Sequence, residues 1–399
     1  MNDDTTESGP RRRYFRYAVF AVAAALVLSL GFVLIPREPD APAPPPFSEQ
    51  ARAAAFSDAV DLRALSLAVA EAAKAANQEP LAATSERAVT LLTVQARALM
   101  LPAAMLPPDP STAMRSAAPS SALVPPSSAQ VPPPAAAAEL ATALHASAAQ
   151  RLRDAEKADG GIARLLAGTG TAQLLAAEKM AAATGTALDT LPGRALSGPV
   201  PSSPKPSASP DPSPGVSSPA PSAAAAPTSG CTATAASGGP GWGSSVTSVA
   251  RAELELVYAY QAALTRLPPA SVAAASDFLT RHKDLSRDAE TVGGASCAAL
   301  PPTPAGYALD AAFLADPAAA LGVLEAGTLP AYGDLIALSD GAGRAWALAA
   351  LESAARRTAY WGASTGPVVG IVLDEAALPE LPAANQRPST SSTPFRGTP

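Results

Sequence analysis

Residues 245–267 read SVTSVARAELELVYAYQAALTRL, and their apolar spacing is that of an amphipathic helix. Val249, Leu256 and Tyr260 fall on one face, and Glu253 falls on the same face. A charged carboxylate inside an apolar face costs free energy unless it is paired, protonated or bound to a metal. This stretch therefore predicts a packed helix that carries a buried polar site.

Three later stretches show the same helical spacing and predict an up-down-up-down four-helix bundle over residues 241–365. Their predicted ranges are 271–292, 317–339 and 343–362. Asp316 is expected to cap its helix, with Pro317 at the first helical position. Pro330 lies inside the third helix and is expected to kink or split it.

Each helix of this predicted bundle places one potential metal ligand on its apolar face. These four residues are Glu253, His282, Glu325 and Glu352. Carboxylates and imidazole are ligands that suit iron, manganese and zinc. The bundle is therefore a candidate metal site.

The bundle resembles the ferritin-like superfamily and, more closely, an actinobacterial ferritin-like domain family of unknown function. The resemblance covers the last third of the chain. It is carried by Ala252-Glu253 with residues 257–260 (VYAY), by His282, by Leu324-Glu325 followed by Tyr332, and by Trp361.

Ferritin-like di-iron proteins place a Glu on helices one and three and Glu-x-x-His on helices two and four. The resemblance implies that Glu253 and Glu325 are the single carboxylates, with His282 and Glu352 on the other two helices. Leu279 and Ala355 stand at the two remaining ligand positions. The family's oxygen chemistry is therefore not expected, and neither is a cofactor, although the four matching residues can hold a single metal ion.

The alternative is a structural role for these carboxylates. In that interpretation Glu253, Glu325 and Glu352 pair with arginines such as Arg251, Arg344 or Arg356, or reach solvent because Ala-rich helices leave a shallow apolar face.

Residues 17–35 (YAVFAVAAALVLSLGFVLI) contain no charge and are long enough to predict a transmembrane helix. Arg11, Arg12, Arg13 and Arg16 precede it, so residues 1–16 are expected to be cytoplasmic and the bulk of the chain extracytoplasmic, at the cell membrane. The alternative is a cleaved signal peptide, and residues 12–15 (RRYF) resemble a twin-arginine export motif. The absence of a good cleavage site favours the membrane anchor.

The remaining chain alternates Pro-rich and helical composition. Residues 36–47 predict a stiff stalk. Residues 48–185 predict helical hairpins or a bundle, with a Pro-rich break at 102–134. Disorder is expected over 186–240, and for most of 366–399. Within 48–185 the predicted helices cover 49–77, 81–101, 135–159 and 162–184.

Cys231 and Cys297 are the only cysteines of the chain. In an oxidising exported compartment they are expected to form a disulfide, which would stabilise the domain by roughly 2 to 4 kcal/mol. Two free thiols are the alternative.

Composition limits the classes of function. A net charge of −6 without a basic patch argues against nucleic-acid binding. Two histidines leave few bases for nucleophilic catalysis, so an enzyme is not expected. The leading hypothesis is a membrane-anchored envelope protein whose ferritin-like bundle acts as a binding or structural module, with an envelope protein or a second copy as partner. The alternative is a metal-binding envelope protein or divergent oxidoreductase.

Overall fold

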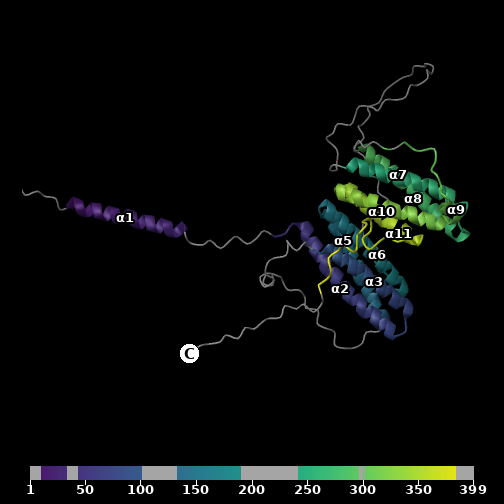
Figure 1. Ribbon diagram of the computed structural model, residues 1–399, viewed down its shortest axis with the longest axis horizontal. Helices are drawn as coiled ribbons and strands as arrows, with labels where there is room; N and C mark the ends of the chain where they lie inside the picture. The colour runs from purple at the N-terminus through teal and green to yellow at the C-terminus, as the bar shows by residue number, and fades with distance from the viewer. Residues whose placement is uncertain are drawn as a thin grey trace, which may run out of the picture. The chain divides into compact units, whose positions relative to one another are not determined.

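The computed structural model describes residues 10–33, 44–100, 133–189, 241–295, 300 and 302–382. These residues form helices and irregular segments, without a β-strand, so the predicted all-α class is confirmed for them. The chain divides into two units, residues 1–45 and residues 46–399. The first unit contains α1, and the second contains the other helices labelled in Figure 1.

The first unit contains α1 (Pro10–Val33), which includes most of the predicted membrane segment. Residues 34 and 35 of that segment lie outside the described part. Within the part of the chain that is described, no helix is both long enough and apolar enough to cross a membrane. The membrane span of residues 17–35 therefore stays a prediction.

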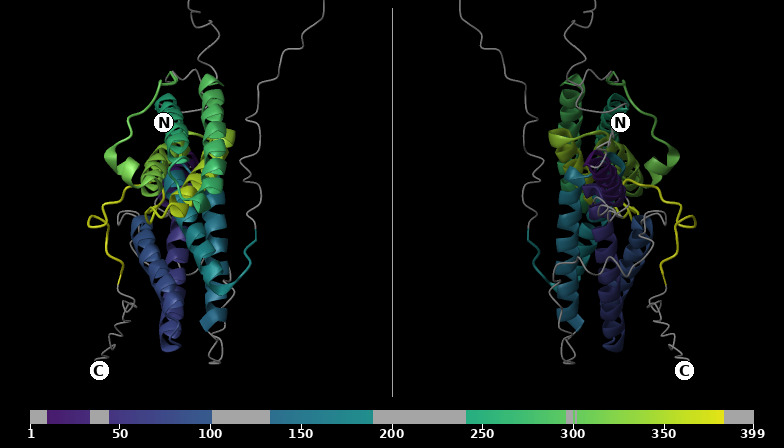
Figure 2. Two further views of the ribbon diagram at one scale, coloured as in Figure 1. Left: turned by 90° about the vertical axis from the view of Figure 1, so that its right-hand side faces the viewer. Right: turned by 90° about the vertical axis from the view of Figure 1, so that its left-hand side faces the viewer.

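The second unit begins with two helical hairpins. The first pairs α2 (Phe47–Ala75) with α3 (Glu79–Leu99), and the second pairs α5 (Pro133–Lys157) with α6 (Gly160–Thr184). Figure 2 shows each pair running side by side. Asn77 has a φ of 56° in the short turn of the first hairpin, a left-handed conformation that Asn tolerates well. These helices lie close to the ranges that hydrophobic spacing predicts.

The C-terminal group contains α7 (Trp242–Ala263), α8 (Pro269–Ala295), α10 (Pro317–Leu338) and α11 (Gly341–Tyr360). A short helix that the sequence spacing did not predict, α9 (Ala311–Ala315), precedes α10. The Asp316 carboxylate accepts a hydrogen bond from the Ala319 backbone amide at 3.1 Å, which confirms the predicted cap. Pro330 was expected to kink or split this helix; α10 continues through the residue, so it is not split there, and the kink stays a prediction.

The two groups of helices share one hydrophobic core. Leu144 and Leu166 belong to the same buried cluster as Leu335, Ile336 and Leu351 of the C-terminal group. The contact between α6 and α10 is close because α6 begins with a glycine. A Cβ atom at Gly160 would lie 2.2 Å from the Ala337 carbonyl oxygen.

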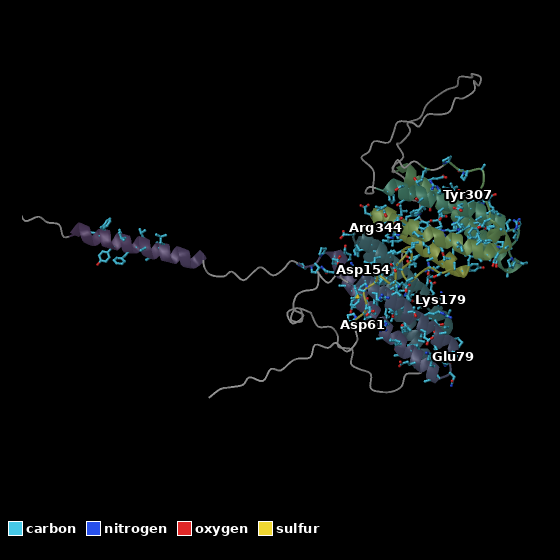
Figure 3. All side chains as sticks on the ribbon, viewed as in Figure 1. Asp61, Glu79, Asp154, Lys179, Tyr307 and Arg344 are labelled. Carbon is cyan, nitrogen blue, oxygen red and sulfur yellow. The ribbon has the colours of Figure 1, made fainter. Side chains whose placement is uncertain are left out.

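Arg344 joins the two groups through backbone hydrogen bonds. Its Nη1 donates to the Ala158 carbonyl at 2.6 Å, and its Nε donates to the Ser339 carbonyl at 2.7 Å. Figure 3 labels this side chain at the junction, near Asp154 of α5. Arg344 thus satisfies carbonyl groups at the ends of α5 and α10 rather than pairing with a buried Glu, as the structural alternative had suggested.

The segment after α11 differs from the predicted disordered tail. Residues 366–382 pack against the N-terminal helices, with Val368 and Val369 fully buried. The Val369 amide donates to the Gly168 carbonyl at 3.1 Å, and Gln95 Nε2 donates to the Pro367 carbonyl at 2.8 Å. The segment has no periodic apolar pattern, and these backbone contacts hold it in place instead.

Several predictions fall on residues outside the described part. They include the disulfide between Cys231 and Cys297, and most of the stalk, the break at 102–134, the linker and the final residues of the tail. These features stay predictions.

Candidate functional site

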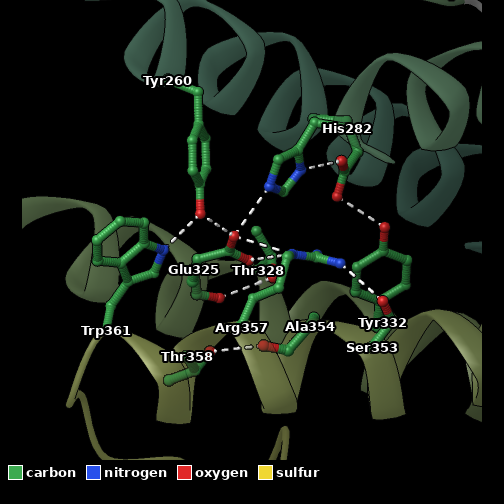
Figure 4. A network of polar contacts seen from close by, with 11 residues as sticks. Tyr260, His282, Glu325, Thr328, Tyr332, Ser353, Ala354, Arg357, Thr358 and Trp361 are labelled. Carbon is green, nitrogen blue, oxygen red and sulfur yellow. Dashed lines mark hydrogen bonds and ion pairs between the residues drawn. The ribbon is translucent and has the colours of Figure 1, made fainter. Parts of the chain in front are cut away.

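The buried polar site of the C-terminal helices lies between α7, α8, α10 and α11 (Figure 4). Glu253 and Tyr260 lie seven residues apart on α7, and Glu325 and Tyr332 lie seven residues apart on α10. A spacing of seven returns to the same face of a helix, so each helix presents one carboxylate and one phenol inward.

The phenols cross between the two helices. Tyr260 Oη donates to Glu325 Oε1 at 2.7 Å, and Tyr332 Oη donates to Glu253 Oε1 at 2.7 Å. The tyrosine of each helix therefore donates a hydrogen bond to the carboxylate of the other helix. Hydrogen bonds to an ionised carboxylate are stronger than those between neutral groups, so this exchange fixes α7 against α10.

His282 of α8 lies between the two carboxylates. Its Nδ1 is 2.7 Å from Glu253 Oε2, and its Nε2 is 2.8 Å from Glu325 Oε1. Ionised carboxylates only accept hydrogen bonds, so both ring nitrogens must carry a proton to satisfy both contacts. The arrangement therefore favours the imidazolium form of His282.

Arg357 of α11 supplies the second positive charge. Its Nε lies 2.9 and 3.0 Å from the two oxygens of Glu325, and its Nη1 donates to Ser353 Oγ at 2.8 Å. Glu253 and Glu325 carry two negative charges, and protonated His282 and Arg357 carry two positive charges. This charge network is therefore neutral as a whole, which lowers the cost of burying its members.

Burial and charge oppose each other in this network. Burial alone lowers the pKa of His282, but its hydrogen bonds to Glu253 and Glu325 outweigh burial and raise that pKa above its ordinary value. Burial alone raises the pKa of Glu325, yet the charge of Arg357 and the hydrogen bond from His282 lower it below the ordinary range. Both shifts favour the charged forms.

Aromatic side chains close one side of the charge network. Trp361 Nε1 donates to Tyr260 Oη at 2.7 Å, so the phenol both accepts and donates. Burial and the neighbouring Glu325 raise the pKa of Tyr260, which keeps its proton available for donation. The Glu253, His282 and Glu325 side chains are each 0% exposed, so solvent does not reach the carboxylates.

Three of the four predicted metal ligands converge, and the fourth does not. Glu352 is buried on α11, with Arg356 Nη1 4.0 Å from its carboxylate, and it lines a pocket between α8 and α11 that the other three residues do not line. Both nitrogens of His282 are engaged by carboxylates, and a guanidinium already compensates Glu325. Within the described residues, no group of three or more His, Cys, Asp or Glu is arranged to hold a metal ion. These side chains fit a charge network better than a metal centre, and direct metal analysis tests that assignment.

The residue that sequence reasoning missed is Arg357. Arg251, Arg344 and Arg356 were the examples proposed as partners of the buried carboxylates. The guanidinium that contacts Glu325 instead belongs to Arg357, the residue that follows Arg356. Arg357 falls on the same helical face as Ala350 and Ala354, which are both fully buried. An arginine in register with buried alanines was the available signal.

A separate pocket lies at the surface of the N-terminal helices. It has a volume of about 520 Å³ and is lined by α3, α6 and residues 364–367. Leu91 and Leu175 give it apolar walls, and Arg87 and Lys179 are its basic groups. Its volume lies in the range of small-molecule sites, roughly 300 to 1,000 Å³.

The fold and the site together define a class of protein, an all-α unit with a buried, charge-balanced polar network. Residues 245–383 match the model of a family described as a domain of unknown function, DUF4439. This match covers α7 from residue 245 onward, α8 to α11, and the packed segment 366–382. Neither the curated proteins nor the solved structures contain a match to the chain.

Proposed function

We propose that this chain is a membrane-anchored envelope protein whose helical unit acts as a binding module, with a ferritin-like bundle that needs no metal for its fold. The observation that carries the proposal is the position of Arg357 against Glu325. This guanidinium provides the charge that a metal ion would otherwise supply. The role of Glu253, His282 and Glu325, together with Arg357, is then to fix α7, α8, α10 and α11 together.

A binding role is supported by the separation between the charge network and the open surface. Glu253, His282 and Glu325 are fully buried, whereas the pocket between α3 and α6 is accessible and has both apolar walls and basic groups. Catalysis needs reactive groups that touch a substrate, while binding needs only a shaped surface. The possible occupants include an envelope protein, a second copy of the chain or a small molecule.

Metal analysis of the purified full chain tests the metal-free fold. We expect substoichiometric iron, manganese and zinc, and an unfolding temperature that a chelator does not change. Stoichiometric metal that is lost in Glu253→Ala would instead support the metal-binding alternative.

Location and orientation are tested separately. We expect the chain to stay in the membrane fraction after alkaline extraction, and a C-terminal tag to be digested by protease added outside intact cells. A tag that is digested only after lysis would overturn the proposed orientation. Light scattering of the full chain in detergent separates a single copy from an oligomer.

A further inference from the structure

A pocket of about 260 Å³ lies at the surface of the C-terminal helices, between α7, α10 and the segment that leads into α9. Two tyrosines line it, Tyr258 and Tyr307, and so do two acidic residues, Glu255 and Asp310. Among the described residues, no lysine, arginine or histidine lines this pocket, and neither does any member of the charge network. The pocket therefore combines aromatic rings with negative charge.

The two tyrosine rings lie next to each other in this lining. Their centroids are 5.6 Å apart and their planes are inclined at 50°. Tyr258 belongs to α7, and Tyr307, labelled in Figure 3, belongs to the irregular segment before α9. A cation within about 6 Å of a ring centroid is attracted by the face of that ring. Because the centroids are so close, one cation can lie within this distance of both rings.

Glu255 provides the negative charge beside the rings. Its side chain is half-buried, and within the described residues it has neither a hydrogen bond nor an ion pair. Arg251 lies one turn earlier on α7 and does not line the pocket. Burial and the charge of Glu255 raise the pKa of Tyr307, while Arg251 opposes this, so the phenol keeps its proton and stays neutral. A half-buried carboxylate without a partner is stabilised when a cation comes close to it.

The remaining lining is acidic on one side and apolar on the other. Asp310 is held in place because its carboxylate accepts a hydrogen bond from the Phe313 amide at 2.7 Å. Phe313 is buried, and Val323 and Leu324 complete the apolar side. A compact, strongly hydrated cation would lose its water against such walls at a high cost. A cation whose charge is surrounded by methyl groups fits the apolar side and the carboxylates together.

We propose that this pocket binds a small quaternary ammonium cation, with its methyl groups against Tyr258 and Tyr307 and its charge near Glu255. The inference adds a site and a ligand class to the binding role proposed above. It does not depend on the pocket between α3 and α6, on metal content or on orientation in the membrane, so each of those proposals can fail without affecting it.

Calorimetric titration of the full chain in a maltoside detergent, which carries no ammonium group, tests the charge preference. The probes are choline, the uncharged alcohol that has carbon in place of the choline nitrogen, and phosphocholine. We expect saturable choline binding with a Kd of about 1 mM or lower, and at least about tenfold weaker binding of the alcohol. Phosphocholine should also bind about tenfold more weakly, because its phosphate would meet two carboxylates.

Three results would overturn the proposal. Choline that does not saturate would exclude the site, and equal binding of the uncharged alcohol would exclude a role for the charge. Tighter binding of phosphocholine than of choline would instead indicate a site for a lipid headgroup.

Substitutions locate the binding. Glu255→Gln keeps the shape of the side chain and should weaken choline binding about tenfold. Glu290→Gln is the matched control, because it removes the same charge from an exposed α8 residue outside the pocket, and it should leave binding unchanged. Tyr307→Leu should weaken binding at least about fivefold, whereas Tyr307→Phe keeps the ring and should stay within about threefold of the original. If Tyr307→Leu does not fold, Glu255→Gln decides: unchanged choline binding contradicts the proposal.

Discussion

Arg357 Nε lies 2.9 Å from one carboxylate oxygen of Glu325 and 3.0 Å from the other, in a site where both side chains are nearly inaccessible to solvent. This ion pair completes a network of two carboxylates, one imidazolium and one guanidinium. Because the charges balance, the C-terminal bundle can bury ionised groups that would otherwise destabilise it.

Arg357→Met tests how much this ion pair contributes to the stability of the fold. The variant leaves Glu325 buried without its guanidinium, and we expect the free energy of unfolding to fall by about 3 to 5 kcal/mol in urea denaturation. The neighbouring Arg356→Met is the matched control, because Arg356 is 44% exposed, pairs with Glu178 at the surface and reaches Glu352 only at 4.0 Å. Its cost should be at most about 1 kcal/mol. Equal costs in the two variants would contradict the assignment.

A second substitution should recover part of the loss. Glu325→Gln combined with Arg357→Met removes one charge of each sign and leaves Glu253 paired with His282. We expect the double variant to be more stable than the sum of the two single losses by about 0.5 to 3 kcal/mol. Strict additivity would show that the two side chains do not interact.

Stability should depend on pH through His282 and Glu325. The pKa of His282 is raised above 6.5 in the folded protein, so its contribution is complete below that pH and is lost as pH rises through the folded value. The pKa of Glu325 is lowered below 4.5, so its contribution is complete above that pH and is lost as pH falls through the folded value.

Both contributions are therefore complete between about pH 4.5 and 6.5, and the free energy of unfolding should decline on the alkaline side of this range. Urea titrations at several pH values measure the profile. His145→Gln should keep the same profile, since His145 lies outside the charge network. A curve that rises from neutral to alkaline pH would contradict the charged form of His282.

Adjacent glycines test the contact between the two groups of helices. Gly160→Ala would place a Cβ 2.2 Å from the Ala337 carbonyl oxygen and should cost about 1 to 3 kcal/mol. Gly161→Ala meets no atom within 4 Å and should be neutral or stabilising by up to about 1 kcal/mol. Thermal unfolding distinguishes the two variants, and similar melting temperatures would argue against this packing.

A second pair of glycines tests the packed segment after α11. Gly366 and Gly370 both have positive φ, 73° and 76°, so alanine is strained at either position. Only at Gly370 would a Cβ also approach backbone closely, 2.7 Å from the Leu329 carbonyl oxygen. Gly370→Ala should therefore lower stability clearly more than Gly366→Ala. The reverse order would contradict the close approach of Gly370 to the Leu329 carbonyl of α10.

The helices were predictable because apolar residues recur with helical spacing along each of them. The convergence of Glu253, His282 and Glu325 was also predictable, since each lies on the apolar face of its own helix. The role of Arg357 was missed, because its one signal, the register with Ala350 and Ala354, is weak in a helix that carries alanine on most of its faces. Only the packing of α11 on α10 shows that Arg357, and not Arg356, contacts Glu325.

The packed segment was missed for a different reason. Residues 366–382 are rich in Gly and Pro and lack periodicity, and they are held by hydrogen bonds between backbone and distant side chains. Arg97, for example, donates to the carbonyls of Leu378 and Pro379 at 2.7 and 2.9 Å. Such contacts join residues far apart in sequence and leave no pattern in the segment itself.

The protonation state of His282 tests the charge network most directly. In the full chain labelled with ¹⁵N-histidine and carrying His145→Gln, His282 is the one remaining histidine. Two-dimensional NMR at about pH 7 reports each ring nitrogen separately. We predict that both nitrogens carry a proton, as two carboxylate acceptors require. A neutral ring with one bare nitrogen, whether unbonded or bound to a metal, would contradict the account.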